Sequence, residues 1–226
     1  MKDLGFEVMH VYGLTETYGH VTQCAWNKNW NDLEEDKINE IKARQGVRYP
    51  NTEGVAVMNP ETMSKVPQDG KTIGEIMIRG NIVMKGYFKD KDATNNATKG
   101  GWFHTGDLAV IYPDGYVKIQ DRSKDIIISG GENISSIEIE NILFKIKDIT
   151  DAAVVAKNND KWGEVPCAFI TLKKNSVLQE SQIIEFCKNN MAKFKIPKKI
   201  IFGKINKTST GKTQKYLLRK IANQIK

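Results

Sequence analysis

The stretch from His104 to Ser136 constrains the fold of this chain more than any other. It contains a Pro-Asp-Gly tripeptide at residues 113–115, with a run rich in apolar residues on either side. Proline presets the first dihedral angles of a tight turn and glycine accepts a left-handed conformation, so this pattern predicts a β-hairpin. Because a hairpin ends beside its own beginning, Asp107 and Arg122 are expected to lie close enough to contact the same ligand.

Composition narrows the class of protein. With 226 residues and 40% hydrophobic content, the chain can bury a core and form one or two domains. The formal charge is +7, but the lysines are scattered among acidic residues and form no basic stripe interleaved with aromatics. This pattern argues against nucleic-acid binding. No segment reaches the length of a membrane span, and neither a signal core nor a peroxisomal address is present, so a cytoplasmic location is expected.

The three cysteines, Cys24, Cys167 and Cys187, form an odd set without metal-ligand spacing. They are expected to be buried thiols in a reducing compartment.

The first half of the chain reads as strands and turns. Alternation at residues 6–12 predicts a strand that ends in Gly-Leu-Thr-Glu-Thr, and a capping pattern from Asp32 predicts a helix that ends at Gly46. Short alternating runs at 54–58, 74–79 and 82–87 predict a small antiparallel sheet or distorted barrel. This sheet would hold Trp102 to Asp107 rigidly.

The amino-acid composition changes between Arg122 and Asp125 to an α/β pattern rich in lysine and isoleucine. We therefore expect two domains, residues 1–121 and residues 122–226. A capping box from Ser135 predicts a helix with an apolar stripe, followed by strands at 152–156, 167–172 and 199–202 and two further helices. The predicted fold class is mixed α/β, with an antiparallel sheet or distorted barrel followed by a compact α/β domain.

Four strings in series resemble the motifs of one family, the adenylate-forming enzymes, and within it the AMP-forming acyl-CoA synthetases. The strings are Tyr-Gly-Leu-Thr-Glu-Thr at 12–17, Trp-Phe-His-Thr-Gly-Asp at 102–107, Asp-Arg-Ser-Lys-Asp at 121–125 with Ser-Gly-Gly-Glu-Asn-Ile at 129–134, and Thr-Ser-Thr-Gly-Lys at 208–212. The resemblance covers essentially the whole chain. It implies ATP, magnesium and coenzyme A as ligands, together with a small carboxylic acid.

The resemblance gives the residues of the first motif roles at the nucleotide. Tyr12 would lie against the adenine with Gly13 beside it, Thr15 would bind the α-phosphate, and Glu16 would hold magnesium, which prefers oxygen ligands. Taken alone, residues 15–17 also fit a simple turn cap.

The later motifs are expected to serve the ribose and the two half-reactions. Asp107 would accept hydrogen bonds from both ribose hydroxyls, and Arg122 would bind ribose or phosphate oxygens. Gly130 and Gly131 would line the passage for the pantetheine arm of coenzyme A, and Lys212 would bridge the carboxylate and the α-phosphate from a polar, flexible loop.

Lys124 occupies the hinge position of the family. Plainer interpretations remain open for these later residues: a turn-capping Asp107, a simple glycine turn at 130–131, a surface lysine at 124 and a solvated turn at 212.

The family's Ser/Thr/Gly-rich phosphate loop is missing upstream of Tyr12, and such enzymes are usually more than twice this long. The expectation is therefore a carboxyl-terminal or truncated synthetase for a short- or medium-chain acid, with the amino-terminal half as a possible partner. Two alternatives stay open: adenylation that feeds a carrier protein, and a fragment that binds nucleotide or coenzyme A, or docks on a partner, without turnover.

Overall fold

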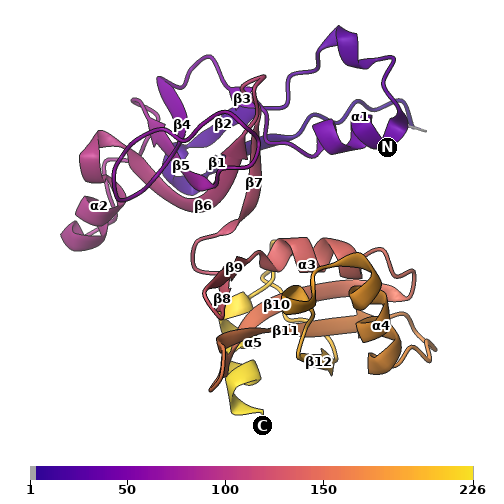
Figure 1. Cartoon of the computed structure of the whole chain (residues 1–226). Helices are drawn as coiled ribbons and strands as arrows, with labels where there is room; N and C mark the ends of the chain where they lie inside the picture. The colour runs from indigo at the N-terminus through magenta and orange to yellow at the C-terminus, as the bar shows by residue number, and fades with distance from the viewer. Residues whose placement is uncertain (1–3, 226) are drawn as a thin grey trace. The chain divides into compact units, whose positions relative to one another are not determined.

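The computed structural model describes residues 4–225, which fall into two compact units. Unit 1 spans Met1–Ser123 and unit 2 spans Lys124–Lys226. The division lies inside the segment where the composition changes. Each unit has its own sheets and its own buried core (Figure 1).

Unit 1 contains two antiparallel sheets. The first has the strand order β1 (Val11–Leu14), β2 (Gly19–Gln23), β3 (Val47–Arg48), and the second has the order β4 (Gly54–Met58), β5 (Gly74–Arg79), β6 (Phe103–Ile111), β7 (Val117–Arg122). Its helices are α1 (Glu35–Lys42) and α2 (Lys91–Ala97), with 3-10 turns η2 (Thr15–Thr17), η3 (Lys28–Trp30) and η4 (Lys99–Gly101). Residues from both sheets, including Val21, Ile76 and Phe103, form one buried cluster.

The predicted antiparallel sheet is confirmed, and so is the hairpin at its end. Tyr112 and Tyr116 bracket the turn, where Gly115 has a positive φ of 81°. No pairing among the described strands closes this sheet into a barrel. The hairpin register sets Asp107 directly opposite Arg122.

Three predictions for unit 1 were wrong in detail. The strand predicted at 6–12 begins only at Val11. The His10 carbonyl accepts from the Cys24 amide, but residues 6–9 have no ladder partner among the described residues, and the side chains of Phe6 and Val8 remain exposed. The helix predicted from Asp32 to Gly46 spans Glu35–Lys42, with Glu34 at its N-cap position. Residues 82–87 form turns rather than a strand.

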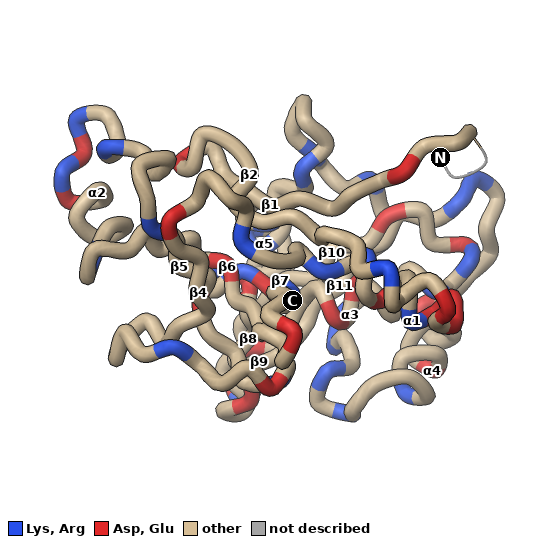
Figure 2. The backbone as a smooth tube through the Cα atoms, turned by 90° about the horizontal axis from the view of Figure 1, so that it is seen from above, with Lys and Arg blue, Asp and Glu red and all other residues tan. Residues whose placement is uncertain are grey.

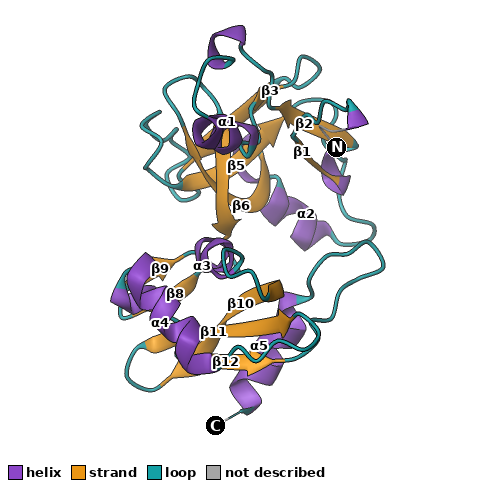
Figure 3. Ribbon diagram, turned by 90° about the vertical axis from the view of Figure 1, so that its right-hand side faces the viewer, coloured by secondary structure: helices purple, strands orange, loops and turns teal. Residues whose placement is uncertain are grey.

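Unit 2 is a mixed sheet with helices on both faces (Figure 3). Its strand order is β10 (Ile149–Asn159), β11 (Gly163–Leu172), β8 (Ile127–Ser129), β9 (Glu132–Ile134), and β12 (Lys199–Phe202) pairs in parallel with β11. Its helices are α3 (Ser136–Leu143), α4 (Glu180–Asn190), α5 (Lys215–Gln224) and the 3-10 turn η5 (Lys193–Lys195).

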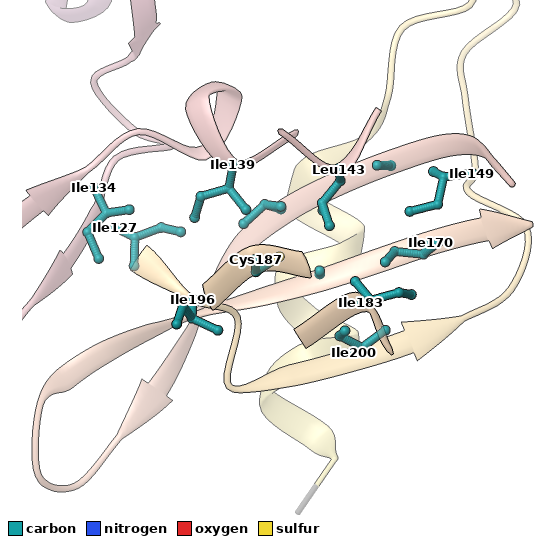
Figure 4. Packing of buried hydrophobic residues seen from close by; sticks show 13 residues of the cluster. Ile127, Ile134, Ile139, Leu143, Ile149, Ile170, Ile183, Cys187, Ile196 and Ile200 are labelled. Carbon is teal, nitrogen blue, oxygen red and sulfur yellow. The ribbon is translucent and has the colours of Figure 1, made fainter. Parts of the chain in front are cut away.

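The two faces of this sheet have separate cores. On one face, Ile139 and Leu143 of α3 and Ile183 of α4 pack over Ile170 (Figure 4). On the other face, Leu218 of α5 packs with residues that alternate with the first set along β10 and β11. Burial on both faces explains why these two strands read as nearly continuous apolar runs.

Unit 2 matches its predicted elements closely. Ser135 caps α3 by accepting a hydrogen bond from the Glu138 amide, as predicted, with Oγ and N 3.1 Å apart. The strands β10 and β11 are longer than predicted, because both of their faces are covered. Within α5, Ala222 is buried, whereas Ile221 is 38% exposed.

Charged residues are spread over both units, with acidic positions among the basic ones (Figure 2). No helix in the described part of the chain is both long enough and apolar enough to cross a membrane.

Candidate active site

Three strands of unit 1 bring Tyr12, Asp107 and Arg122 together. The Tyr12 hydroxyl donates a hydrogen bond to Oδ2 of Asp107 over 2.6 Å. Nε of Arg122 lies 3.1 Å from the other carboxylate oxygen, Oδ1. The sequence placed Asp107 and Arg122 together, and the structure adds Tyr12 to the same cluster.

Asp107 reaches this position through a bulge in β6, whereas the sequence predicted a turn. Glu75 of β5 faces Leu108 and Met77 faces His104, so β6 has three residues where β5 has only Ile76. Gly106 takes a positive φ of 71° in the middle of the bulge. Bulges of this kind re-aim side chains at the edge of a site.

Asp107 lies between a hydroxyl donor and a positive charge. Its side chain is only 6% exposed, while Arg122 is half-exposed and supplies a positive charge. Burial first, and the charge of Asp107 second, raise the pKa of Tyr12 far above the ordinary tyrosine value. Tyr12 therefore stays protonated and donates. Oδ2 accepts the hydrogen bond from Tyr12 and Oδ1 is paired with Arg122, and each oxygen retains capacity for another donor.

The turn after β1 presents two predicted residues. Thr17 is buried, and its hydroxyl binds the carbonyl oxygens of Leu14 and Gly19, which fixes the turn. Thr15 is consequently left exposed and Glu16 half-buried. Oε1 of Glu16 accepts a hydrogen bond from the Tyr87 hydroxyl over 3.1 Å.

Gly13 has a steric role in the structure. A Cβ atom built at this position would lie 2.1 Å from the carbonyl oxygen of Gly19, where the register of β1 against β2 shifts. Only glycine permits this approach of the two strands. Gly13 thereby shapes the turn that carries Thr15 and Glu16.

In unit 2, the carbonyl oxygen of Lys124 accepts a hydrogen bond from Nη1 of Arg219 over 3.1 Å. The same nitrogen forms an ion pair with Asp125. Helix α5 therefore holds the first residues of unit 2. The side chain of Lys124 is exposed.

Gly130 and Gly131 form the turn between β8 and β9, and both have positive φ, 60° and 88°. A Cβ at Gly130 would lie 2.9 Å from the Trp162 ring, and the Gly130 amide donates to the Trp162 carbonyl. At Gly131, a Cβ would meet no described atom within 4 Å. The two glycines thus differ: one packs on an indole and the other borders open space.

Lys212 lies at the end of a tight turn. Gly211 donates to the carbonyl of Thr208, and the backbone amide of Thr208 donates to the carbonyl of Lys212. On one side of the turn, Lys207 pairs with Asp151 at 2.6 Å. On the other, Lys215 pairs with Glu140 at 2.7 Å. The Lys212 side chain is exposed.

Sequence reasoning missed several residues that hold the motif residues within each unit. Tyr87, Lys215 and Arg219 carry no motif signal, because each acts on a partner more than 70 positions away in the chain. Glu75 did carry a signal. It is a carboxylate near the start of a strand whose other residues up to Ile78 are buried, and it binds the bulge beside Asp107.

Comparison with known proteins identifies the family. The family model for the AMP-binding enzyme matches residues 1–88, and the model for the AMP-binding enzyme C-terminal domain matches residues 138–212. The chain belongs to the AMP-binding enzyme family. The matched ranges contain the first motif, at 12–17, and the last, at 208–212.

Two CoA ligases match nearly the whole chain. It is 52% identical over 231 residues to an acetate–CoA ligase of Humulus lupulus, covering 100% of this chain and 40% of that one. A peroxisomal benzoate–CoA ligase of Arabidopsis thaliana is 48% identical over 234 residues, covering 98% and 40%. The chain thus spans about two fifths of the length of these relatives.

The fold agrees with that of solved members of the family. The crystal structure of ATP-bound MatB from Rhodopseudomonas palustris superposes with a TM-score of 0.83 at 32% identity, over 96% of this chain and 41% of that one. The mixed α/β fold class is confirmed.

Proposed function

We propose that the chain supplies the ribose-binding platform and the mobile domain of an AMP-forming acid–CoA ligase. In the first half-reaction, an oxygen of the substrate carboxylate attacks the α-phosphorus of ATP, and pyrophosphate leaves. In the second, the thiol of coenzyme A attacks the acyl carbon of the acyl-AMP, loses its proton and releases AMP. The cluster in which Asp107 accepts from the Tyr12 hydroxyl and pairs with Arg122 supports this proposal most directly, because a carboxylate held in this way suits a diol.

The nucleotide would be bound by unit 1. Asp107 has acceptor capacity for both ribose hydroxyls, and the half-exposed Arg122 has donors for ribose or phosphate oxygens. Tyr12 and Gly13 would border the adenine, and the exposed hydroxyl of Thr15 would donate to the α-phosphate.

Glu16 would hold magnesium together with the phosphates of ATP. Tyr87 occupies only one of its carboxylate oxygens in the hydrogen bond described above. No group of three or more His, Cys, Asp or Glu residues able to hold a metal occurs among the described residues. The Glu16 carboxylate together with ATP oxygens fits magnesium, which is often held by one or two carboxylates plus substrate phosphates. The ion would neutralise charge on the phosphates.

Unit 2 would serve the two half-reactions in turn. Lys212 would stabilise the charge that redistributes between the carboxylate and the α-phosphate. A single preorganised donor in a water-poor site contributes about 3–4 kcal/mol. The open space beside Gly131 would admit the pantetheine arm, and rotation about Lys124 would exchange the two faces.

For the substrate, we propose a short- or medium-chain carboxylic acid, in keeping with the acetate–CoA ligase relative. The benzoate–CoA ligase relative makes an aromatic acid the necessary comparison. Thioester formation measured with acetate, butyrate, hexanoate and benzoate should be fastest with one of the aliphatic acids. A clear preference for benzoate would contradict this assignment.

The proposed location is cytoplasmic, as the sequence indicates, although the benzoate–CoA ligase relative is named peroxisomal. A fluorescent fusion that leaves the carboxyl terminus unmodified tests the location. Diffuse fluorescence is expected, and punctate fluorescence that coincides with a peroxisomal marker would contradict it.

Pyrophosphate release tests the activity. The measurement compares the isolated chain with a fusion to the part of the Humulus lupulus relative that this chain does not match. We expect release from the fusion in the presence of acid, ATP and magnesium. A fusion that binds ATP but releases no pyrophosphate would favour the alternative of a binding module without turnover.

A further inference from the structure

The search for a further functional residue leads to Glu75, a buried carboxylate to which the proposed chemistry gives no role. Its side chain is 9% exposed, and it lies in β5 beside the bulge that carries Asp107. A buried charge is costly unless other groups compensate it. The contacts of Glu75 therefore need an explanation.

Both oxygens of Glu75 have partners that belong to β6. Oε1 accepts a hydrogen bond from the Gly106 amide over 2.7 Å, and Oε2 lies 3.1 Å from Nδ1 of His104. Nε2 of His104 in turn faces the carbonyl oxygen of Lys99 at 3.2 Å. The carboxylate therefore joins the residue before the bulge to the middle of the bulge.

Gly106 depends on this contact because the bulge interrupts the β5–β6 ladder. A bulged residue loses its ladder partner, and a buried amide without an acceptor is destabilising. Glu75 supplies the acceptor. On the other side, the Gly106 carbonyl accepts from the Ser123 amide over 2.8 Å. The peptide groups on both sides of Gly106 are thus fixed.

Thr105 completes the arrangement. Its hydroxyl donates to the Ile76 carbonyl over 2.8 Å and accepts from the Asp107 amide over 3.1 Å. The backbone amides of Gly106 and Asp107 are therefore bound by side chains rather than by the neighbouring strand. The direction of the Asp107 side chain follows from these two amide contacts.

We propose that Glu75 is a positioning residue that holds the Thr105–Asp107 bulge in the conformation that directs the Asp107 carboxylate at a ribose diol. This inference rests on the proposed function, because it assumes that Asp107 binds ribose. Glu75 itself does not touch the nucleotide. The effect of Glu75 should therefore appear as a preference for a nucleotide with ribose over one that lacks the 2′ and 3′ hydroxyls.

The test measures the affinity of the whole chain for AMP and for 2′,3′-dideoxy-AMP by isothermal titration calorimetry. Wild type is expected to prefer AMP, and the variant Glu75→Met should lose most of this preference, by about tenfold or more. Its affinity for the dideoxy nucleotide should stay near the wild-type value. The exposed Glu53, which pairs with Arg79 at the end of β5, gives the matched control: Glu53→Met should keep the preference.

The variant Glu75→Gln tests rescue. Its amide oxygen can still accept from Gly106, so it should discriminate better than Glu75→Met. An equal loss in Gln and Met would overturn the inference, because the contact with Gly106 would then not be the cause. Glu75→Met with unchanged discrimination would overturn it as well.

A further variant tests the same contacts in case Glu75→Met does not fold. Thr105→Val is nearly isosteric and removes the hydroxyl that binds the Asp107 amide, so the AMP preference should fall in it too. Full preference in Thr105→Val would overturn the claim that these contacts direct Asp107. Wild type that does not distinguish the two nucleotides would instead contradict the proposed function, and the inference with it.

Discussion

At the scale of single residues, the hydrogen bond from the Tyr12 hydroxyl to Asp107 is one of the contacts that sequence motifs did not reveal. In the variant Tyr12→Phe the ring remains but Asp107 loses a donor. A hydrogen bond to a charged group contributes about 1.5–3 kcal/mol, so AMP affinity should fall by about tenfold or more. Calorimetric titration checks this. Tyr49→Phe, which removes a hydroxyl elsewhere in unit 1, is the control. Equal affinities for AMP in Tyr12→Phe and wild type would contradict the role of the hydroxyl.

The buried thiols make a pH prediction at the same scale. Burial raises the pKa of Cys167 and of Cys187 to about 11, from the ordinary thiol value of 9.0. Below pH 9 both thiols are protonated in the folded and the unfolded chain, so they add no pH dependence there. Between about pH 9 and 11 only the unfolded chain loses the protons, so the free energy of unfolding falls as pH rises.

Urea denaturation at several pH values measures this fall. The variants Cys167→Ala and Cys187→Ala should each show a shallower decrease of the unfolding free energy over this range than wild type. Identical slopes in wild type and both variants would show that these thiols titrate normally in the folded chain.

At the scale of elements, Gly13 and Gly19 form a matched pair in the β1–β2 connection. A Cβ at Gly13 would collide with the backbone of β2, whereas a Cβ at Gly19 would meet nothing within 4 Å. Gly13→Ala should therefore destabilise unit 1 by about 1–3 kcal/mol or more, the usual range for overpacking, and Gly19→Ala should not. Thermal unfolding followed by circular dichroism tests the difference. Similar midpoints for the two variants would contradict the steric role.

A second comparison sets a largely buried ion pair of the terminal helix α5 against an exposed ion pair within α4. Lys215 and Glu140 are 15% and 14% exposed, while Lys188 and Glu185 are 55% and 62% exposed. Removal of one partner of a buried pair costs about 3–5 kcal/mol, and an exposed pair contributes about 0–1 kcal/mol. Lys215→Met should therefore destabilise unit 2 much more than Lys188→Met. Chemical denaturation compares them, and equal losses would contradict the anchoring of α5.

Elements with local signals were predicted well from the sequence. The turn at 113–115 and the cap at Ser135 depend on neighbours within four positions, so residue type alone determines them. The bulge at Thr105–Asp107 depends on Glu75, which lies about thirty positions earlier, and no local pattern encodes that contact. The strand expected at 6–12 shows the opposite error: alternation was present, but no described strand pairs with residues 6–9.

At the scale of the whole molecule, we propose that the two half-reactions use different faces of unit 2. Lys212 lies at the turn before α5, and Gly131 lies between β8 and β9. The joint at Lys124 would present them in sequence. In the fusion with the Humulus lupulus relative, Lys124→Pro should therefore impair one half-reaction much more than the other. Equal loss of both half-reactions would count against rotation.

The most direct test compares Lys212→Ala and Gly131→Leu in that fusion. Two rates are measured for each variant: pyrophosphate release from ATP, and thioester formation from preformed acyl-AMP. We predict that each variant loses a different rate. Lys212→Ala should lose only pyrophosphate release, by about a hundredfold or more, and Gly131→Leu should lose only thioester formation. Parallel loss of both rates in both variants would contradict it.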